Sequence, residues 1–270
     1  MAALATFNQV NIARRNFPTP YVYSAAEWNV KVEDSGRGDL AYLGNEHFLV
    51  TDDGAPTLGF VGSSLSLFHR NSLRKTFLES KKIIQLPPDT GLGYEQFRGV
   101  TFNGNHIVVL VYQLSGLGIE TVRLRGYDMQ GNQKWETQAL NTDFGAGYIT
   151  LNSLCFDGKS YYSVLTNAKA CIVAQFDVVK SPVGVTTAHL AYSWTPSTFP
   201  TTKTSLCFDG RRLWMLYTTS ARVGHSINIA QFQKTGTNNQ WPVTPQLSGV
   251  VNAPRGIEYD GRNLSWLYVD

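Results

Sequence analysis

A short hairpin pattern recurs along this 270-residue chain, and it restricts the possible folds more than any other feature. Its clearest copy spans residues 206–210, with the sequence LCFDG, and the apolar run LWMLY follows at 213–217. An Asp-Gly pair between two apolar runs predicts a tight turn between antiparallel strands, because glycine tolerates the positive φ that such turns require. The pattern therefore predicts two short paired strands at this point of the chain.

The same pattern occurs four more times at a nearly constant spacing. Residues 154–158 and 257–261 are close copies, residues 100–104 have Asn in place of Asp, and residues 40–44 are the loosest copy. The turn glycines are Gly44, Gly104, Gly158, Gly210 and Gly261, separated by 60, 54, 52 and 51 residues. Repeats of this length that consist mostly of strand are typical of β-propeller blades.

The strand before each turn glycine alternates between large and small residues. Large residues stand four and two positions before the glycine: Leu40, Val100, Leu154, Leu206 and Ile257, then Tyr42, Phe102, Phe156, Phe208 and Tyr259. Mostly smaller residues stand five and three positions before it: Asp39, Gly99, Ser153, Ser205 and Gly256, then Ala41, Thr101, Cys155, Cys207 and Glu258. Alternation with a period of two is a strand signal. One large and one small face suit an innermost strand that packs between two neighbouring blades.

Together these features predict an all-β fold, a five-bladed β-propeller of four-stranded blades. Residues 10–14 and 21–28 resemble outer strands without inner ones, whereas residues 255–270 resemble an inner hairpin without outer strands. We therefore expect the N-terminal outer strands to pair with the C-terminal inner hairpin and close the ring, which removes exposed sheet edges. We expect one domain over 1–270: blade five outer strands in 6–32, blade one in 33–86, blade two in 87–140, blade three in 141–196, blade four in 197–250 and blade five inner strands in 251–270.

The outer strands of blades one to four are expected in the segments between the hairpins. They are predicted at Ser64–His69, Arg74–Ile84, Glu120–Asp128, Gln133–Ala139, Ala170–Val178, Thr186–Trp194, Ser226–Lys234 and Gln240–Gln246. The best candidate for a helix, Ser72–Lys82, fits a strand about as well. Trp28, Trp135, Trp194 and Trp241 fall at similar positions of outer strands, where they either stack on sugars or pack onto the next blade.

Composition excludes several classes of function. The net charge is only +3 and the sequence contains no Lys/Arg block, so we expect no nucleic-acid partner. Three cysteines, Cys155, Cys171 and Cys207, predict neither a disulfide framework nor a zinc site, and no metal or cofactor is expected. The first residues lack the charged region and apolar core of a signal peptide, and no apolar run is long enough for membrane insertion.

Two acidic residues are catalytic candidates. Glu258 stands where the other repeats have Ala, Thr or Cys, and Asp39 opens the first inner strand. A lone acid at such a position either pairs with an arginine or serves as a general acid or base. Asp39 also ends the tripeptide Arg37-Gly38-Asp39, which matches an integrin-recognition motif, but Arg-Gly recurs at 98–99 and 255–256 and is explained by the repeat.

Ligand-binding candidates lie where the inner strands begin. Arg98 and Arg255, joined by Arg37, would face one mouth of the central channel, with Asn152 and Thr204 completing the circle. Converging guanidinium groups bind a carboxylate, phosphate or sulfate. Alternatively, each arginine only satisfies carbonyl groups near the end of its own strand.

Through the hairpin repeat the chain resembles the β-propeller superfamily over nearly all of its length. The five-blade count resembles tachylectin-like lectins and five-bladed glycosidases, but the sequence has neither family's own motifs, so the resemblance assigns no functional residue. Fold-level analogy is a weak argument for function.

We expect a non-catalytic structural or binding module rather than an enzyme. Low charge, a polar and aromatic β surface and the lack of a signal peptide suit a bacteriophage or other virus component, such as a tail, fibre or decoration protein. Its partners would be other protein subunits of the assembly or a host-surface glycan used as a receptor. It would be found in the virion or outside the cell after lysis. The alternatives are a glycan-active hydrolase that uses Asp39 and Glu258, and an intracellular protein-interaction scaffold.

Overall fold

The fold is built from strands. The computed structural model describes residues 2–8, 25–30, 39–52, 62–71, 76–87, 93–117, 120–140, 150–166, 171–180, 186–194, 205–220, 225–232, 241–243, 254–261 and 263–269. Within these ranges the chain forms strands β1 to β20, and none of these residues belongs to a helix that is long and apolar enough to cross a membrane. The prediction of an all-β chain is confirmed.

Three of the sheets in the described ranges have four antiparallel strands each. One contains β7 (Gly93–Phe102), β8 (Ile107–Ser115), β9 (Glu120–Tyr127) and β10 (Gln133–Glu136). The next contains β11 (Thr150–Phe156), β12 (Tyr161–Thr166), β13 (Cys171–Lys180) and β14 (Thr186–Trp194). The third contains β15 (Ser205–Phe208), β16 (Leu213–Ser220), β17 (His225–Phe232) and β18 (Trp241–Val243).

The fourth sheet has eight strands and joins the two ends of the chain. Its order is β19-β20-β1-β2-β6-β5-β4-β3. Its strands are β1 (Ala2–Asn8), β2 (Ala25–Val30), β3 (Leu40–Gly44), β4 (His47–Asp52), β5 (Ser64–Asn71), β6 (Thr76–Gln85), β19 (Pro254–Tyr259) and β20 (Asn263–Val269). All neighbours are antiparallel except β2 and β6, which share one parallel pair, Asn29 with Thr76.

Two details of the sequence-based strand assignment change. The strand that pairs with β20 is β1, from Ala2 to Asn8, whereas the strand expected at 10–14 lies outside the described residues. The ambiguous segment 72–82 is resolved in favour of a strand from Thr76 onward, because its alternating residues pair along β5.

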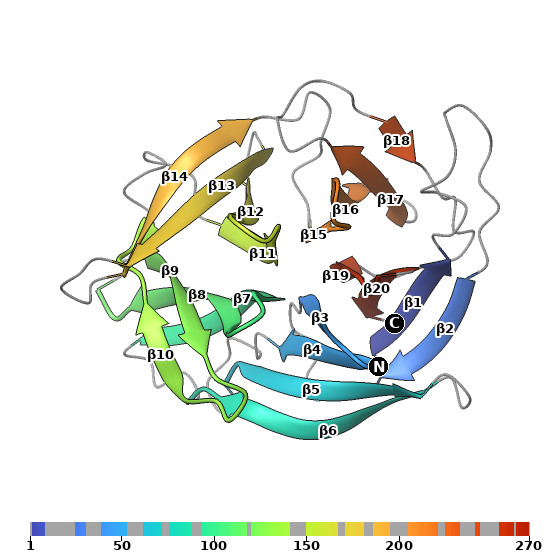
Figure 1. The fold of residues 1–270 in the computed structure, drawn as a ribbon, viewed down its shortest axis with the longest axis horizontal. Helices are drawn as coiled ribbons and strands as arrows, with labels where there is room; N and C mark the ends of the chain where they lie inside the picture. Colours follow the sequence, from blue (N-terminus) through green and yellow to red (C-terminus); the bar gives the residue numbers. More distant parts are fainter. Residues whose placement is uncertain are drawn as a thin grey trace.

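The sheets are arranged around a common centre, as Figure 1 shows, with β3, β7, β11, β15 and β19 innermost. These five strands contact one another in order around the centre, and β19 in turn contacts β3. The strand before each turn glycine is thus the innermost strand of its sheet, which is the position that its size alternation predicted.

The hairpin turns explain why Asp or Asn stands directly before the turn glycine in most copies of the repeat. All five turn glycines have φ between +90° and +95°. In three of the turns the residue before the glycine accepts hydrogen bonds through Oδ1 from the N–H groups two and three residues later. These acceptors are Asn103, Asp157 and Asp209, at 2.7 to 3.0 Å. An Asx turn of this kind fixes the loop without help from distant residues.

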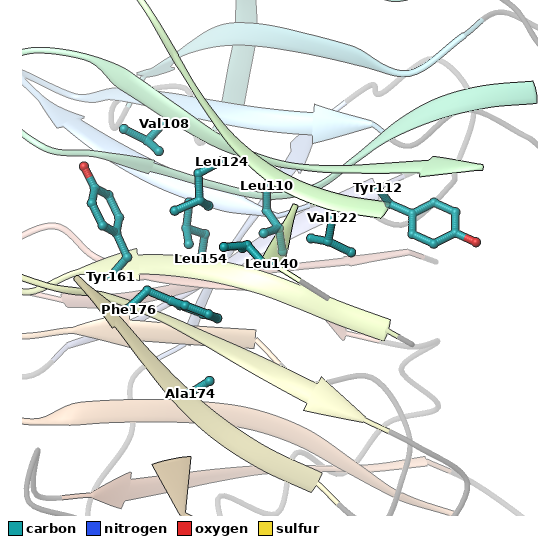
Figure 2. Close-up of a cluster of buried hydrophobic side chains, with 10 residues drawn as sticks. All are labelled: Val108, Leu110, Tyr112, Val122, Leu124, Leu140, Leu154, Tyr161, Ala174 and Phe176. Atoms are coloured by element: carbon teal, nitrogen blue, oxygen red, sulfur yellow. The ribbon is translucent and has the colours of Figure 1, made fainter. Parts of the chain in front are cut away.

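Apolar side chains fill the spaces between neighbouring sheets. Figure 2 shows one such cluster, in which Leu110 and Leu124 lie against Leu154 and Phe176 of the next sheet. The large residues of the inner strands pack against the preceding sheet, as Leu154 does here and Leu206 does in the following cluster. Trp135 also packs on the cluster of Figure 2, so this outer tryptophan serves packing; the side chains of Trp28, Trp194 and Trp241 lie outside the described residues.

Candidate functional site

Two layers of side chains lie where the five inner strands meet. The Asp39 layer consists of the residues five positions before each turn glycine: Asp39, Gly99, Ser153, Ser205 and Gly256. All five are buried, and Asp39 is only 2% exposed. The Glu258 layer lies two residues further along each strand, and alternation places it on the same strand face. Its members are Ala41, Thr101, Cys155, Cys207 and Glu258.

The Asp39 carboxylate is the main hydrogen-bond acceptor at the centre. Its Oδ2 accepts from the backbone N–H of Val100 at 3.0 Å and of Leu154 at 3.1 Å. Its Oδ1 accepts from the hydroxyls of Ser205 at 2.9 Å and Ser153 at 3.3 Å. The side chain of Asp39, which directly precedes β3, therefore forms hydrogen bonds with strands of three other sheets.

The two serines complete a set of backbone contacts. Ser153 Oγ accepts from the N–H of Leu206 at 2.9 Å, and Ser205 Oγ accepts from the N–H of Ile257 at 3.0 Å. The N–H of Leu40 also donates to Asp39. An innermost strand has one edge without a neighbouring strand, so its buried N–H groups need other acceptors. In the Asp39 layer, one buried backbone N–H of each of the five inner strands donates to the side chain of Asp39, Ser153 or Ser205.

The two glycines of the layer allow this close approach. A Cβ atom on Gly99 would lie 2.5 Å from the carbonyl carbon of Ser153, and one on Gly256 would lie 2.7 Å from the nitrogen of Leu40. Both obstacles are backbone atoms, which cannot rotate away. Any side chain at these two positions would push neighbouring inner strands apart.

Burial dominates the ionisation of Asp39. Removal from water disfavours the charged carboxylate and raises its pKa from 3.8 to about 7, although the hydrogen bonds from Val100, Ser205, Leu154 and Leu40 oppose this shift. Asp39 thus exchanges its proton near neutral pH.

Glu258 differs from the rest of its layer. Ala41, Thr101, Cys155 and Cys207 are buried, whereas Glu258 is half-buried. Burial of its carboxyl raises its pKa well above the usual value, and the charges of Asp39 and Asp260 raise it further, against one hydrogen bond from the N–H of Tyr259. These surroundings therefore favour the protonated form of Glu258.

Arg98 lies within its own sheet. It occupies an irregularity between β7 and β8, donates from Nη2 to Oε1 of Gln96, and stacks on the ring of Tyr112 at 5.0 Å. Tyr112 has a raised pKa because it is buried and hydrogen-bonded to Glu120. Arg98 thus forms part of a polar and aromatic cluster on β7 and β8.

The other predicted ligand-binding residues are only partly described. Arg255 lies at a similar irregularity, between β19 and β20, and Asn152 lies in β11, but their side chains are outside the described residues. Arg37 and Thr204 lie outside them entirely. Of the predicted site residues, Asp39 and Glu258 are close enough for the charge of one to affect the other. Ligand binding by the five mouth residues stays a prediction.

Sequence reasoning missed the two serines. Ser153 and Ser205 stand at the same repeat position as Asp39, but their small size suggested only tight packing. The available signal was that three of the five residues at this position have side-chain oxygen atoms. Asp39, which ends the Arg37-Gly38-Asp39 tripeptide, is buried and is the central acceptor.

No protein-family model matches the sequence, and no curated protein matches it. Among solved structures, the chain is similar to a candidate glycosidase from Bacteroides thetaiotaomicron, with a TM-score of 0.51 and 12% identity over 87% of this chain and 86% of that chain. It is also similar to a thermostable family-43 glycoside hydrolase, with a TM-score of 0.50 and 12% identity over 87% of this chain and 89% of the other. A periplasmic gluconolactonase from Pseudomonas aeruginosa is less similar, with a TM-score of 0.44, 10% identity and coverage of 98% and 75%.

At such low identity the first two matches inform on the fold. They show that the chain shares the fold of these two proteins, in agreement with the predicted β-propeller fold, and they assign it to no family.

The preference for a non-catalytic virion component was wrong. The two matches with TM-scores of 0.51 and 0.50 are named as a glycosidase and a glycoside hydrolase, which favours an enzyme. Low charge and an aromatic β surface come with the fold, and a fold hosts many functions, so these features could not separate a virion part from an enzyme. The predictions on partners and localisation were not tested and stay predictions.

Proposed function

We propose that this protein is a glycan-active hydrolase with the Glu258 carboxyl as its proton donor. The observation that carries the proposal is the strongly raised pKa of Glu258 in a layer whose other members are small and uncharged. Hydrolysis of a glycosidic bond requires a carboxylic acid that still holds its proton at working pH and gives it to the leaving oxygen as the bond between that oxygen and the sugar carbon breaks. Water then bonds to the sugar carbon and releases one proton to solvent, and the carboxylate takes up a proton from solvent again.

Asp39 acts in this proposal as a positioning residue. Its oxygens are occupied by hydrogen bonds and it is buried, which disfavours direct contact with substrate. Its charge raises the pKa of Glu258, so ionisation of Asp39 near pH 7 keeps the donor protonated as the pH rises. The pair thereby divides two tasks between two carboxyl groups in different surroundings.

The strand-start residues Arg98, Arg255, Arg37, Asn152 and Thr204 are proposed to contact the glycan. Support comes from Arg98, which stacks on the ring of Tyr112, and the centroid of that ring lies 6.0 Å from the centroid of the Tyr94 ring. Aromatic faces and guanidinium groups together suit a sugar that carries an anionic substituent. Replacing Arg98 with Ala should then raise KM and leave kcat nearly unchanged.

The proposed architecture is a single domain with five four-stranded blades, closed between the chain ends. Two observations support it. The eight-stranded sheet consists of two antiparallel groups of four that share only the Asn29–Thr76 parallel pair. Pairing of β1 with β20 extends over seven residue pairs, from Ala2 with Val269 to Asn8 with Asn263.

The test is hydrolysis of a panel of aryl glycosides that covers common pentoses and hexoses in both anomeric forms, together with soluble polysaccharides. The wild type should release product from at least one of them, and Glu258→Gln should lower kcat by about 100-fold or more. Asp128→Asn, at the exposed β9–β10 turn, is the matched control and should keep full activity. Hydrolysis that persists in Glu258→Gln, or no hydrolysis of any substrate, would contradict the proposal.

The pH profile separates the role of Asp39. Asp39→Asn removes the charge that helps to keep Glu258 protonated, so the alkaline limb of the kcat profile should move to lower pH. A purely structural Asp39 would lower the amount of folded enzyme without moving that limb.

A further inference from the structure

Two histidines face each other across neighbouring strands, away from the central site. His47 begins β4 and pairs with His69 of β5. The next pair along the ladder, Glu46 with Arg70, has the N–H of Arg70 donating to the carbonyl of Glu46 at 2.8 Å. Pairs alternate along an antiparallel ladder, so His47 and His69 form a non-hydrogen-bonded pair, in which side chains approach most closely.

The two imidazole rings have the spacing of a chelating pair. Their centroids are 4.9 Å apart and their planes meet at 59°. Two ring nitrogens that each bind one metal ion at about 2.0–2.1 Å place the ring centres about 4.5–5.2 Å apart for bond angles between square and tetrahedral. The observed spacing falls inside this range. His69 is exposed and His47 half-buried, so an ion can reach the pair from solvent.

The positive charge next to His69 along β5 does not oppose a cation. The closest positive group along β5 is Arg70, whose side chain stacks on Phe48 at 5.2 Å. Side chains alternate along a strand, so Arg70 lies on the other face of the sheet from His69. Its charge is balanced by ion pairs with Glu46 and with Asp260 at 2.8 Å.

We propose that His47 and His69 together bind one divalent transition-metal ion of the class that prefers imidazole, with water as the remaining ligands. Affinity should follow the usual order for nitrogen ligands, with Cu²⁺ above Ni²⁺ and Zn²⁺. The described residues contain no group of three or more His, Cys, Asp or Glu side chains placed to hold a metal, so this is a two-ligand site. The bound ion would connect β4 to β5 beside the β3–β4 turn.

The test is titration of the full chain with Cu²⁺ by calorimetry, followed by electron paramagnetic resonance of the bound ion. The second imidazole binds intramolecularly, so the wild type should hold one ion at least about tenfold more tightly than His47→Gln or His69→Gln. The resonance spectrum should show two equivalent nitrogen ligands in the wild type and one in each variant.

A matched control uses a histidine without a facing imidazole. His106 packs edge-on against Trp135 at 6.3 Å, and His106→Gln should leave Cu²⁺ binding unchanged. Ni²⁺ should also raise the unfolding temperature of the wild type and not of the two single variants, since a ligand of the folded state stabilises it. Equal affinity in the wild type and the single variants, or one nitrogen in the wild-type spectrum, would overturn the proposal.

Discussion

Asp39 and Glu258 are both acids on inner strands, yet their surroundings differ in one respect. Asp39 accepts hydrogen bonds from the backbone of three strands and from two serines, whereas the hydrogen bond to Glu258 comes from its own neighbour, Tyr259. Burial raises the pKa of both carboxyls. The comparison teaches that a perturbed pKa alone does not identify a catalytic group. Asp39 contacts and supports the surrounding strands, whereas the proposed function makes Glu258 the proton donor.

The largest expected effect is that of removing the Asp39 carboxylate. Asp39→Ala leaves the buried N–H groups of Leu40, Val100 and Leu154 without their acceptor, and each such loss costs about 1–3 kcal/mol. We expect the free energy of unfolding to fall by roughly 4 kcal/mol, measured by urea denaturation. A fall below about 1 kcal/mol would mean that Asp39 is not the central support.

The pH dependence of stability should identify the same residue. The folded-state pKa of Asp39 is about 7 and the ordinary value is 3.8, so between these values the folded protein keeps a proton that the unfolded chain has released. Stability is therefore complete below about pH 4 and falls as the pH rises towards 7, by up to about 4 kcal/mol. Urea denaturation between pH 4 and 8 should give a clearly shallower decline in Asp39→Asn. Parallel curves for the two proteins would contradict the assignment.

A smaller effect is expected when a methyl group is added to the Asp39 layer. The Cβ of Gly99→Ala would lie 2.5 and 2.7 Å from backbone atoms of Ser153 and Leu154, which should lower the free energy of unfolding by about 2–3 kcal/mol. Gly104→Ala is the control, because no atom lies within 4 Å of its Cβ and only its φ of +91° is unfavourable, at about 1 kcal/mol. Equal losses in the two variants would show that crowding at the centre is unimportant.

The smallest effect on stability is expected for Glu258→Gln. Glutamine has the shape of the protonated acid, so at about pH 4, where the wild-type side chain is protonated in both folded and unfolded protein, the free energy of unfolding should change by less than about 1 kcal/mol. At pH 9 the variant should be the more stable protein, because the wild type must then either keep a proton or bury a charge. A large loss of stability at about pH 4 would place Glu258 with Asp39 among the supporting residues.

The sequence predicted what depends on neighbours along the chain. The turn at Asp209-Gly210 and the predicted strand Thr186–Trp194 both agree with the structure, since an Asx turn and an alternating strand are determined locally. The bonds from Asp39 to Val100, Leu154 and Ser205 span 61, 115 and 166 residues. These hydrogen bonds depend on how the strands meet around the centre. The sequence pattern therefore predicted where these residues lie in the strands but not which residues form hydrogen bonds with one another.

The predicted catalytic candidates illustrate the same limit. Glu258 was identifiable because it departs from the repeat, and the turn at Leu43-Gly44 departs from it in another way. There Leu replaces the Asx acceptor, and Asn45 and Glu46 both adopt positive φ, at 49° and 62°. A departure from the repeat thus marks a position whose contacts or backbone conformation differ from those in the other repeats. The sequence does not say whether that position serves function or folding.

The pairing of β1 with β20 has a consequence for how the protein is made. Residues 2–8 find a partner strand at 263–269, so this edge of β1 stays unpaired until the distant segment has been synthesised. Contacts between such distant segments close slowly, because most of the chain must be ordered before they form. The pairing of β1 with β20 should therefore form late in folding, and the unpaired edge is exposed to chaperones and to aggregation until then.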